Sequence, residues 1–495
     1  MRHVLHDALV QPAATLGHRR RHRGNYARVW RIAPFMLAIS LSQWMAAAEA
    51  AAPPKQAIAI TDVTVIDVRQ DRVSRPRTVI VDDGRITAIG GSDLIPEGAQ
   101  RVDGRGRFLI PGLVDMHVHL FNLSSHRPPN DWTFPLYVAN GVTALREMRG
   151  DAASIAQVVR WRKAFEEGEL IAPRILAAGI AVNGKSPDDA AREVDAAAAA
   201  GADFIKVFSE VPESHWRAIV EAARKRWLPV VGHAPAGMSL LVAADGGQRS
   251  DEHLMQAYEA CSSIEAQLLA ERHGLGGEAL VARRDAQEPQ ALAAFDRDIC
   301  WRVSKALTAS GQAQVPTLVL ADEDALAARG PPSADPRWRY LRADEHARWE
   351  QFLAGYTAQD AVLAKQRWPV ARKIVSAMHQ AHVPIMTGTD APMPGVYPGF
   401  SLHEEMSMLV DSGLTPSDAL RSATLVPAKF LGIAGAAGTV EVGMRGDLVL
   451  LDADPTKNIR NTRRINAVLF DGRLLRRADL DALLEGAAGK GAGSH

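Results

Sequence analysis

The chain has 495 residues, more than a typical single domain, so we expect one large domain with an attachment, or two to three domains. Hydrophobic residues make up 47% and charged residues 23%, a balance that excludes a disordered or fibrous chain as the main state. The 57 basic and 57 acidic residues cancel, but residues 1–50 hold seven Arg and two acids, which leaves 50 basic and 55 acidic residues downstream. This mildly acidic remainder gives no support for nucleic-acid binding.

Residues 1–50 have the pattern of an export signal. Arginines, the last of them Arg31, precede an apolar stretch from Ile32 to Ala47, and Ala48-Glu49-Ala50 resembles a small-x-small cleavage site. A membrane anchor is the competing interpretation, but polar residues and Pro34 interrupt this stretch, which is short for a span. We therefore predict a signal peptide at 1–50, no stable membrane span after its removal, and a periplasmic or secreted mature protein.

Two β-rich segments flank a long middle region. The first contains the expected strands Ile58–Ile60, Thr64–Ile66, Thr78–Val81 and Arg85–Ile89, and the second contains Thr439–Val442, Asp447–Leu451 and Ala467–Phe470. Asp83-Gly84 and Asp471-Gly472 are typical of tight hairpin turns. We predict that residues 57–110 and 432–480 form one small β-sandwich domain from both ends of the chain.

The middle region, 111–431, alternates short apolar runs with helical stretches. The expected strands are Leu113–Leu120, Val142–Arg146, Arg174–Ala178, Phe204–Phe208, Pro229–His233, a less obvious one ending at His253, Val315–Leu320 and Pro384–Thr389. The best marked helix opens at Leu402 and ends at Gly413. Repeated βα units of this number predict an α/β fold with a (β/α)8 TIM barrel, whose active site lies at the C-terminal ends of its strands.

Three features do not fit this alternation. Residues 321–370 are polar with scattered Trp residues, and predict a helical insertion that is either a lid over the barrel or a solvated helical hairpin. Residues 481–495 form a tail, Gly/Ala-rich and disordered from 486 onward. Cys261 and Cys300 could form a disulfide after export, but two thiols in so long a chain are more often free and buried, which is our expectation.

Several chemically active side chains stand at the expected strand ends. His117 and His119 point to the same side of an extended strand, so two imidazoles can bind one metal ion. The other such residues are Lys206, whose ammonium would be buried in an apolar strand, and His233, His253 and Asp390. Each has an ordinary structural explanation by itself, but their position at successive strand ends predicts a metal site.

These segments resemble the amidohydrolase superfamily, and in detail its imidazolonepropionase-like and prolidase-like metal-dependent hydrolases. The resemblance covers roughly Ile58 to Leu475. The matching segments are Ile110–His119, Gly201–Val207, Gly232–Ala234, Ser250–His253, Gly388–Ala391 and Gly443–Leu450.

The resemblance implies a binuclear site. By the family pattern His117, His119 and Asp390 hold one divalent ion, His233 and His253 hold the other, and Lys206, carboxylated by CO2, bridges the two. A carbamate suits this position because an ammonium cannot bind a cation, whereas a carboxylated lysine can. Imidazole and carboxylate ligands favour zinc, with iron, manganese and cobalt as open alternatives.

The implied reaction is hydrolysis by a metal-bridging hydroxide. Asp390 would accept the proton of that hydroxide and pass it to the leaving nitrogen of an amide, dipeptide or cyclic amide. A lactonase or esterase using the same site is an open alternative, and a scaffold that has lost catalysis is a third. Tyr397 and Arg146 are candidate substrate contacts, although Arg146 suits a structural role equally well. The expected partner is a small-molecule substrate, and an oligomer is compatible with the sequence.

Overall fold

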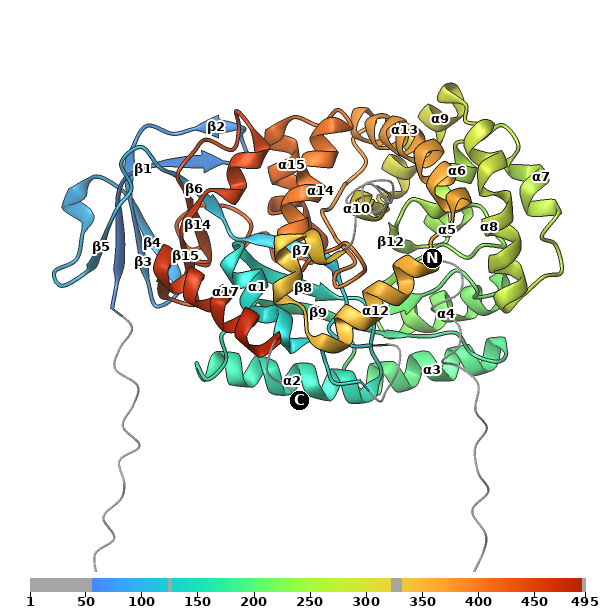
Figure 1. Cartoon of the computed structure of the whole chain (residues 1–495), viewed down its shortest axis with the longest axis horizontal. Helices are drawn as coiled ribbons and strands as arrows, with labels where there is room; N and C mark the ends of the chain where they lie inside the picture. Colours follow the sequence, from blue (N-terminus) through green and yellow to red (C-terminus); the bar gives the residue numbers. More distant parts are fainter. Residues whose placement is uncertain (1–55, 123–126, 322–331, 492–495) are drawn as a thin grey trace, which may run out of the picture. The chain divides into compact units, whose positions relative to one another are not determined.

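The computed structural model describes residues 56–122, 127–321 and 332–491, which belong to one compact unit, Gln56–His495. The predicted signal peptide lies outside the described residues. Within them no helix combines the length and the apolar character needed to cross a bilayer. The unit is built on a ring of parallel strands and a second, mixed sheet (Figure 1).

Seven parallel strands form most of the predicted barrel. They pair in chain order as β7 (Leu113–Val118), β8 (Val142–Glu147), β9 (Arg174–Ala181), β10 (Phe204–Val207), β11 (Val230–Gly232), β12 (Gln248–Glu252) and β13 (Ala313–Val315). The eighth segment closes the ring through isolated parallel bridges, in which Ile385 pairs with Gln314 and Ala391 pairs with Val118. The predicted α/β barrel is therefore confirmed, with an eighth segment too irregular to be a full strand.

The seventh strand lies earlier in the chain than the sequence predicts. We expected Val315–Leu320, but β13 ends at Val315, and Leu318–Ala321 forms the short helix α10. Pro316 has no N–H to donate to a neighbouring strand, and Thr317 has a positive φ of 45°. The chain therefore leaves the sheet at the point where the strand was expected to begin.

Helices follow the strands around the barrel. They are α1 (Phe134–Ala139), α2 (Ala152–Glu166), α3 (Pro187–Ala199), α4 (Glu213–Lys225), α5 (Leu240–Asp245), α6 (Met255–Ala260), α7 (Glu265–Ala270), α8 (Gly277–Ala293), α9 (Arg297–Ser310), α12 (Ala343–Ala354), α13 (Ala358–Gln380), α14 (Phe400–Asp411), α15 (Pro416–Ser422), α16 (Leu425–Phe430) and α17 (Arg477–Gly491). Short 3-10 turns lie at η1 (Ser92–Leu94), η2 (Asp131–Thr133), η3 (Pro332–Ala334), η4 (Pro336–Tyr340) and η5 (Ile459–Arg463).

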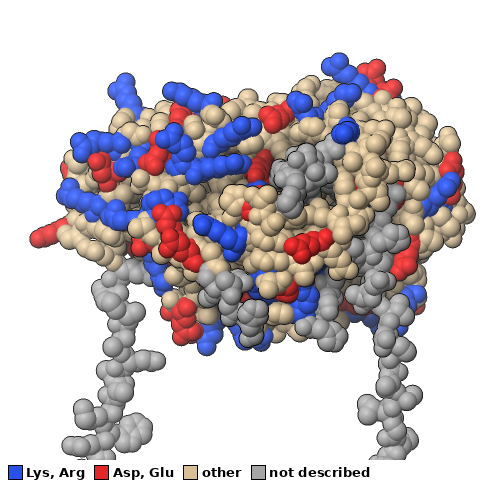
Figure 2. Space-filling view, in the orientation of Figure 1, with Lys and Arg blue, Asp and Glu red and all other residues tan. Residues whose placement is uncertain are grey.

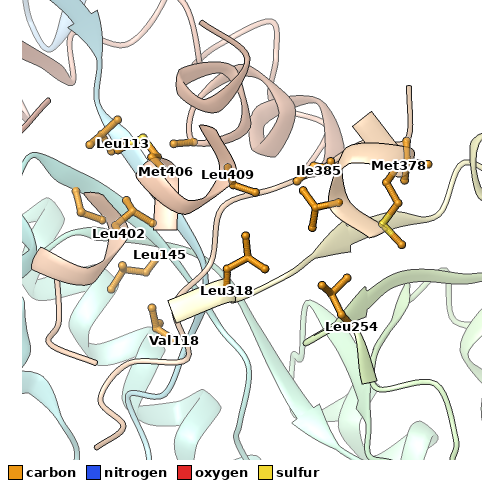
Figure 3. Close-up of a cluster of buried hydrophobic side chains, with 14 of the residues drawn as sticks. Leu113, Val118, Leu145, Leu254, Leu318, Met378, Ile385, Leu402, Met406 and Leu409 are labelled. Carbon is orange, nitrogen blue, oxygen red and sulfur yellow. The ribbon is translucent and has the colours of Figure 1, made fainter. Parts of the chain in front are cut away.

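Helix α14 shows how the helices cover the barrel. Leu402, Met406 and Leu409 recur at helical spacing and are fully buried. Figure 3 places them in one cluster with Leu113 of β7 and Leu145 of β8. This apolar face holds the first two strands, one of which carries the His117–His119 pair, against the helical layer.

The small β structure joins the two ends of the described chain. Its strands are β1 (Ile58–Asp67), β2 (Arg72–Val73), β3 (Arg77–Asp82), β4 (Arg85–Gly90), β5 (Gln100–Asp103), β6 (Phe108–Pro111), β14 (Leu448–Leu451), β15 (Ile465–Phe470) and β16 (Arg473–Arg476). Strand β14 pairs with β6 despite their separation in sequence (Figure 1). One end of β1 pairs with β3 and β5 and the other with β6, so the sheet folds around a core of its own. The expected strand Thr439–Val442 is absent from this sheet: Val440 is buried, but Val442 is exposed in a turn.

The surface over this β structure carries both signs of charge. In Figure 2, Lys and Arg side chains gather there, with Asp and Glu side chains among them. Several of these opposite charges pair, as Arg69 does with Glu441 and Arg107 with Asp452. Exposed pairs of this kind contribute little to stability.

The described part of the 321–370 insertion is a packed element. Residues 322–331 lie outside the described residues, and η3, η4, α12 and the start of α13 follow. Trp349 of α12 is fully buried, with its ring centroid 4.9 Å from that of Tyr397. Arg348 of α12 donates a hydrogen bond to the backbone oxygen of Pro392 at 3.1 Å. The insertion therefore packs on the loop that follows the eighth barrel segment and is not a solvated hairpin.

The expected C-terminal tail is largely helical. Residues 477–491 form α17, and residues 492–495 lie outside the described residues. Leucine and alanine side chains recur at helical spacing and pack against Leu136 of α1 and neighbouring apolar residues; they are Leu480, Leu483, Leu484, Ala487 and Ala488. This apolar stripe outweighs the glycine content that suggested disorder.

The two cysteines form a disulfide, which corrects the expectation of free thiols. Cys261 follows the last residue of α6, Cys300 lies in α9, and their Cα atoms are 4.2 Å apart. Both residues are fully buried. The bond closes a loop of helices α7 and α8 on the barrel.

Candidate metal centre

The first two candidate ligands, at the end of β7, both face Asp390. The Nε2 atoms of His117 and His119 lie 3.2 Å and 2.5 Å from Oδ1 of Asp390. The backbone N–H of Asp390 donates to the oxygen of His117 at 2.7 Å, which fixes the eighth segment beside β7. Gly388 permits this approach, because a Cβ there would lie 2.5 Å from Cγ1 of Val315 and 2.9 Å from Cβ of His117.

His253 and His233 complete a row of imidazoles. The ring centroid of His253 lies 4.5 Å from that of His117 and 4.9 Å from that of His233. His253 follows β12 and has a positive φ of 72°, a conformation that is uncommon for a non-glycine residue. Strained backbone of this kind is common at functional sites, and here it turns the ring toward His117.

In three of the histidines, Nδ1 is within hydrogen-bond distance of another side chain. His117 Nδ1 donates to Oε2 of Glu252 at 2.9 Å, His253 Nδ1 lies 2.7 Å from the Thr317 hydroxyl, and His233 Nδ1 lies 3.2 Å from the Ser209 hydroxyl. Thr317 donates its own hydroxyl hydrogen to the oxygen of Pro316, so its oxygen accepts from His253. Holding Nδ1 in this way orients the ring and leaves Nε2 as the ligand atom, as is usual for histidines that bind metal.

Burial favours the neutral form of three of these imidazoles. Burial lowers the pKa of His253 to about 3, and burial also holds the pKa values of His119 and His233 well below their ordinary range. A neutral imidazole retains the lone pair that a metal ion requires.

Lys206 is fully buried among these groups. Its Nζ has no hydrogen-bond partner among the described residues and lies 5.3 Å from the centre of the Phe208 ring. Burial lowers the pKa of Lys206 to about 8, against the pull of the Glu252 and Asp390 carboxylates. Gly232 leaves space for this side chain, since a Cβ there would lie 2.7 Å from Cδ of Lys206.

A donor set suited to a cation results from this convergence. Ligand atoms of His117, His253 and Asp390 all lie within 4.8 Å of one another. His119 joins this set through its contact with Asp390, and His233 joins it through its ring contact with His253. Nε2 of His117 and Oδ1 of Asp390 are buried without a hydrogen-bond partner in the described region, as expected of metal ligands, and Nζ of Lys206 is buried there without one as well. The residues therefore fit a divalent metal ion.

Arg146 occupies a structural position. It is fully buried, and its guanidinium donates to Glu252 at 2.9 Å, to the Ser250 hydroxyl at 3.2 Å and to the backbone oxygen of Met116 at 2.6 Å. This ion pair holds Glu252, which in turn holds His117. The geometry therefore favours the structural role of Arg146 over contact with substrate.

Tyr397 is buried outside the row of imidazoles. Its ring packs against Trp349, and the guanidinium carbon of Arg337 lies 4.2 Å from its centroid. These contacts join the loop after the eighth segment to the insertion. They give no support to the predicted substrate contact.

The sequence prediction omitted several groups that hold the ligands. Glu252 orients His117, and Asp115 accepts hydrogen bonds from the backbone and hydroxyl of Thr389 at 3.1 Å and 2.6 Å. The sequence feature that could have identified Glu252 is its position beside His253 at a strand end. For Asp115 it was a carboxylate two residues before His117 in an apolar strand.

Comparison with known proteins agrees with this geometry. The sequence profile of the Amidohydrolase family matches residues 108–475. A 61-residue segment is 39% identical to the imidazolonepropionase of Mycolicibacterium smegmatis, and covers 12% of this chain and 15% of that protein. The match thus spans far less than the length of this curated relative.

Solved structures resemble the chain over most of its length. A Xaa-Pro dipeptidase with bound methionine superimposes with a TM-score of 0.61 at 20% identity, covering 85% of this chain and all of the other. A bottromycin amidohydrolase superimposes with a TM-score of 0.63 at 23% identity, covering 87% and 90%. At these identities the likeness shows a shared fold.

Proposed function

The chain belongs to the amidohydrolase family, whose members include metal-dependent hydrolases, and on that premise we propose that it cleaves a C–N bond in a small amide, dipeptide or cyclic amide. The observation that carries the proposal is the convergence of His117, His253 and Asp390 with their ligand atoms within 4.8 Å. The orphaned atoms of His117, Lys206 and Asp390 add support, because catalysis at a metal needs such donors.

Two divalent ions are proposed for this site. His117, His119 and Asp390 would hold one, and His233 and His253 the other. When bound, such ions polarise a carbonyl group and lower the pKa of a water molecule. Neutral imidazoles and a carboxylate favour zinc among the candidates.

Lys206 is the proposed bridging ligand, after carboxylation by CO2. Its amine has a pKa of about 8, so a substantial fraction is neutral near physiological pH and can form an N–C bond to CO2 with release of a proton. The resulting carbamate is an anion with two oxygens, one for each cation. Its charge also removes the cost of an ammonium buried beside the metal ions.

Asp390 is the proposed proton carrier. Its carboxylate, 7% exposed, is the least buried of the acidic groups at the centre of the site. In this role it takes a proton from the attacking water and delivers it to the leaving nitrogen, which then departs as an amine.

We also propose that the mature protein acts in the periplasm or outside the cell. The pattern of residues 1–50 predicts export, and the buried disulfide between Cys261 and Cys300 is of the type that persists in an oxidising compartment.

The proposal is tested with the Asp390→Asn variant. Zinc-loaded protein is assayed against N-acyl amino acids, dipeptides, hydantoin-like rings and lactones, and the variant is assayed on every compound that wild-type cleaves. We expect turnover to fall by about 100-fold or more, because the proton carrier is lost, while much of the metal is retained. The control is Asp411→Asn, which changes an exposed carboxylate at the end of α14. Near wild-type rates in Asp390→Asn would rule out this role, and hydrolysis of lactones alone would replace the amidase with an esterase.

A further inference from the structure

Arg149 lies at the exit of β8, beside the metal ligands. It follows Glu147, the last residue of β8, by two positions, and its backbone N–H donates to Oε1 of Glu147 at 2.6 Å. The preceding residue, Met148, donates its N–H to the oxygen of Val118 at 3.0 Å. The chain at Arg149 is therefore fixed next to the end of β7, which carries His119.

The guanidinium of Arg149 lacks a partner within the described residues. Its Nε atom is buried and has no hydrogen bond. Of the nearby carboxylates, Glu147 accepts from the backbone N–H groups of Leu120 and Arg149, and Oδ1 of Asp390 accepts no hydrogen bond from Arg149 or from any other described residue. Burial and then the charge of Arg149 lower the pKa of His119, and the Asp390 carboxylate opposes the lowering of the Arg149 pKa by burial; both effects agree with a backbone fixed beside the end of β7. A buried donor without an acceptor is costly, so a ligand that supplies the acceptor would bind favourably.

A second guanidinium approaches from the insertion. Arg348 of α12 donates to Oε2 of Glu345 at 2.8 Å and to the backbone oxygen of Pro392, two residues after Asp390. Glu345 is fully buried and also pairs with Arg127, so this network anchors Arg348 firmly. Burial lowers the pKa of Arg149, the Asp390 and Glu147 carboxylates raise it, and the charge of Arg348 adds a smaller lowering. Arg348 thus reaches the loop after Asp390 from α12, whereas Arg149 comes from the exit of β8.

We propose that Arg149, with Arg348 beside it, binds a carboxylate of the substrate at the edge of the metal centre. A carboxylate accepts two parallel hydrogen bonds from the planar fork of Arg149 and supplies the acceptor that its buried Nε lacks. The substrate class would then be compounds with a free carboxylate near the scissile bond, such as N-acyl amino acids or peptides, and not their neutral amides. This inference rests on the proposed function, because it takes the metal centre as the reacting end of the same site.

Binding measured in a catalytically silent background tests the inference. In zinc-loaded full-length Asp390→Asn protein, calorimetry compares a panel of N-acetyl-L-amino acids with the matching carboxamides. We expect at least one acid to bind about tenfold or more tightly than its carboxamide, and Arg149→Gln to remove that preference while leaving carboxamide affinity unchanged. Arg149→Lys keeps the charge without the fork and should restore part of the preference. Arg160→Gln, which removes an exposed arginine of α2, is the matched control and should change nothing.

The outcomes separate the two proposals. Equal affinity for acids and carboxamides, absence of binding by any acid, or an equal loss for both classes in Arg149→Gln would overturn the carboxylate site. If Arg149→Gln fails to fold, Arg348→Gln decides: a selective loss of acid affinity supports the site, and unchanged affinity overturns it. A clear acid preference in a protein whose unmutated form hydrolyses none of the panel would reject the hydrolase proposal alone.

Discussion

Neighbouring side chains prepare the histidines of this site before any ion binds. Glu252, Thr317 and Ser209 each contact Nδ1 of one imidazole, which leaves Nε2 for a ligand. Glu252 forms a buried ion pair with Arg146, so the orientation of the His117 ring depends on both of these residues in the barrel interior. Such supporting contacts raise metal affinity by fixing the ligand geometry.

Gly232 gives a prediction about the space around Lys206. Its φ is 120°, and a Cβ there would lie 2.3 Å from the oxygen of Val207 and 2.7 Å from Cδ of Lys206. Gly232→Ala should therefore lower the free energy of unfolding by about 2 kcal/mol or more and weaken metal retention. Chemical denaturation measures the first effect. Gly237→Ala is the control, because its Cβ would meet only Leu280 at 3.6 Å; equal stability of the two variants would contradict the account.

Glu405 gives a prediction about pH. Burial raises its pKa to about 8, from an ordinary value of 4.5, and only one of its oxygens accepts a hydrogen bond, from Val319 N–H. Between these values the unfolded chain releases a proton that the folded protein keeps, so this group lowers stability as pH rises. Relative to wild-type, Glu405→Gln should gain up to about 5 kcal/mol between pH 4.5 and 8. Denaturation curves across this range measure the gain, the exposed Glu350→Gln should follow wild-type, and parallel profiles for wild-type and Glu405→Gln would refute the prediction.

At the scale of residues, the candidate metal ligands can be predicted from the sequence better than the residues that hold those ligands in place. The four candidate histidines, Lys206 and Asp390 stand at strand ends where a polar residue interrupts an apolar run. Arg149 follows a strand end in the same way, but nothing local distinguishes it from an exposed loop arginine. The Nε atom of Arg149 is buried without a partner among the described residues while the neighbouring Glu147 accepts from backbone N–H groups, and only the packed structure shows these contacts.

The secondary elements divide into those that build the barrel end and those that cover it. Strands β7 to β13 bring the ligands together, and α12 packs against the loop after Asp390 through Trp349 and Arg348. Helix α8, which lies between β12 and β13 in the chain, carries Arg284, which donates to the Ser209 hydroxyl at 2.8 Å. A helix outside the barrel thus contacts the group that orients His233.

The disulfide should stabilise this helical excursion. Cys261 and Cys300 are 39 residues apart, and closing a loop of that length contributes about 4 kcal/mol in the chain-entropy model. Cys261→Ser/Cys300→Ser should lower the unfolding free energy by an amount of this order. Adding a reductant during denaturation should destabilise wild-type and leave the double variant unchanged. A reductant effect of equal size on both proteins would show that the bond does not contribute.

For the helices and strands, sequence periodicity predicted the kind of element better than it predicted where the element begins and ends. The apolar spacing of α14 and the Asp-Gly hairpin turns are confirmed, since both are local properties of the chain. The seventh strand was misplaced because Val315–Leu320 is largely apolar, and the backbone at Pro316 and Thr317 ends the strand. The terminal helix was missed because its stripe of Leu and Ala needs the surface of α1 to be stable.

In the molecule as a whole, the candidate metal ligands lie at one end of the barrel. Strands from distant parts of the sequence end together, which is why ligands between His117 and Asp390 meet although 273 positions separate the two residues. The sequence anticipated this convergence because the ends of parallel barrel strands share one face. It could not supply the substrate, which depends on loops and insertions that differ between relatives with the same barrel.

The most direct test of the metal centre is the number of divalent ions bound per chain. Elemental analysis of full-length protein, dialysed after zinc loading, should give about two equivalents, falling sharply in the His117→Ala variant. A protein that retains no metal, or retains as much in His117→Ala as in wild-type, would contradict the assignment of this site.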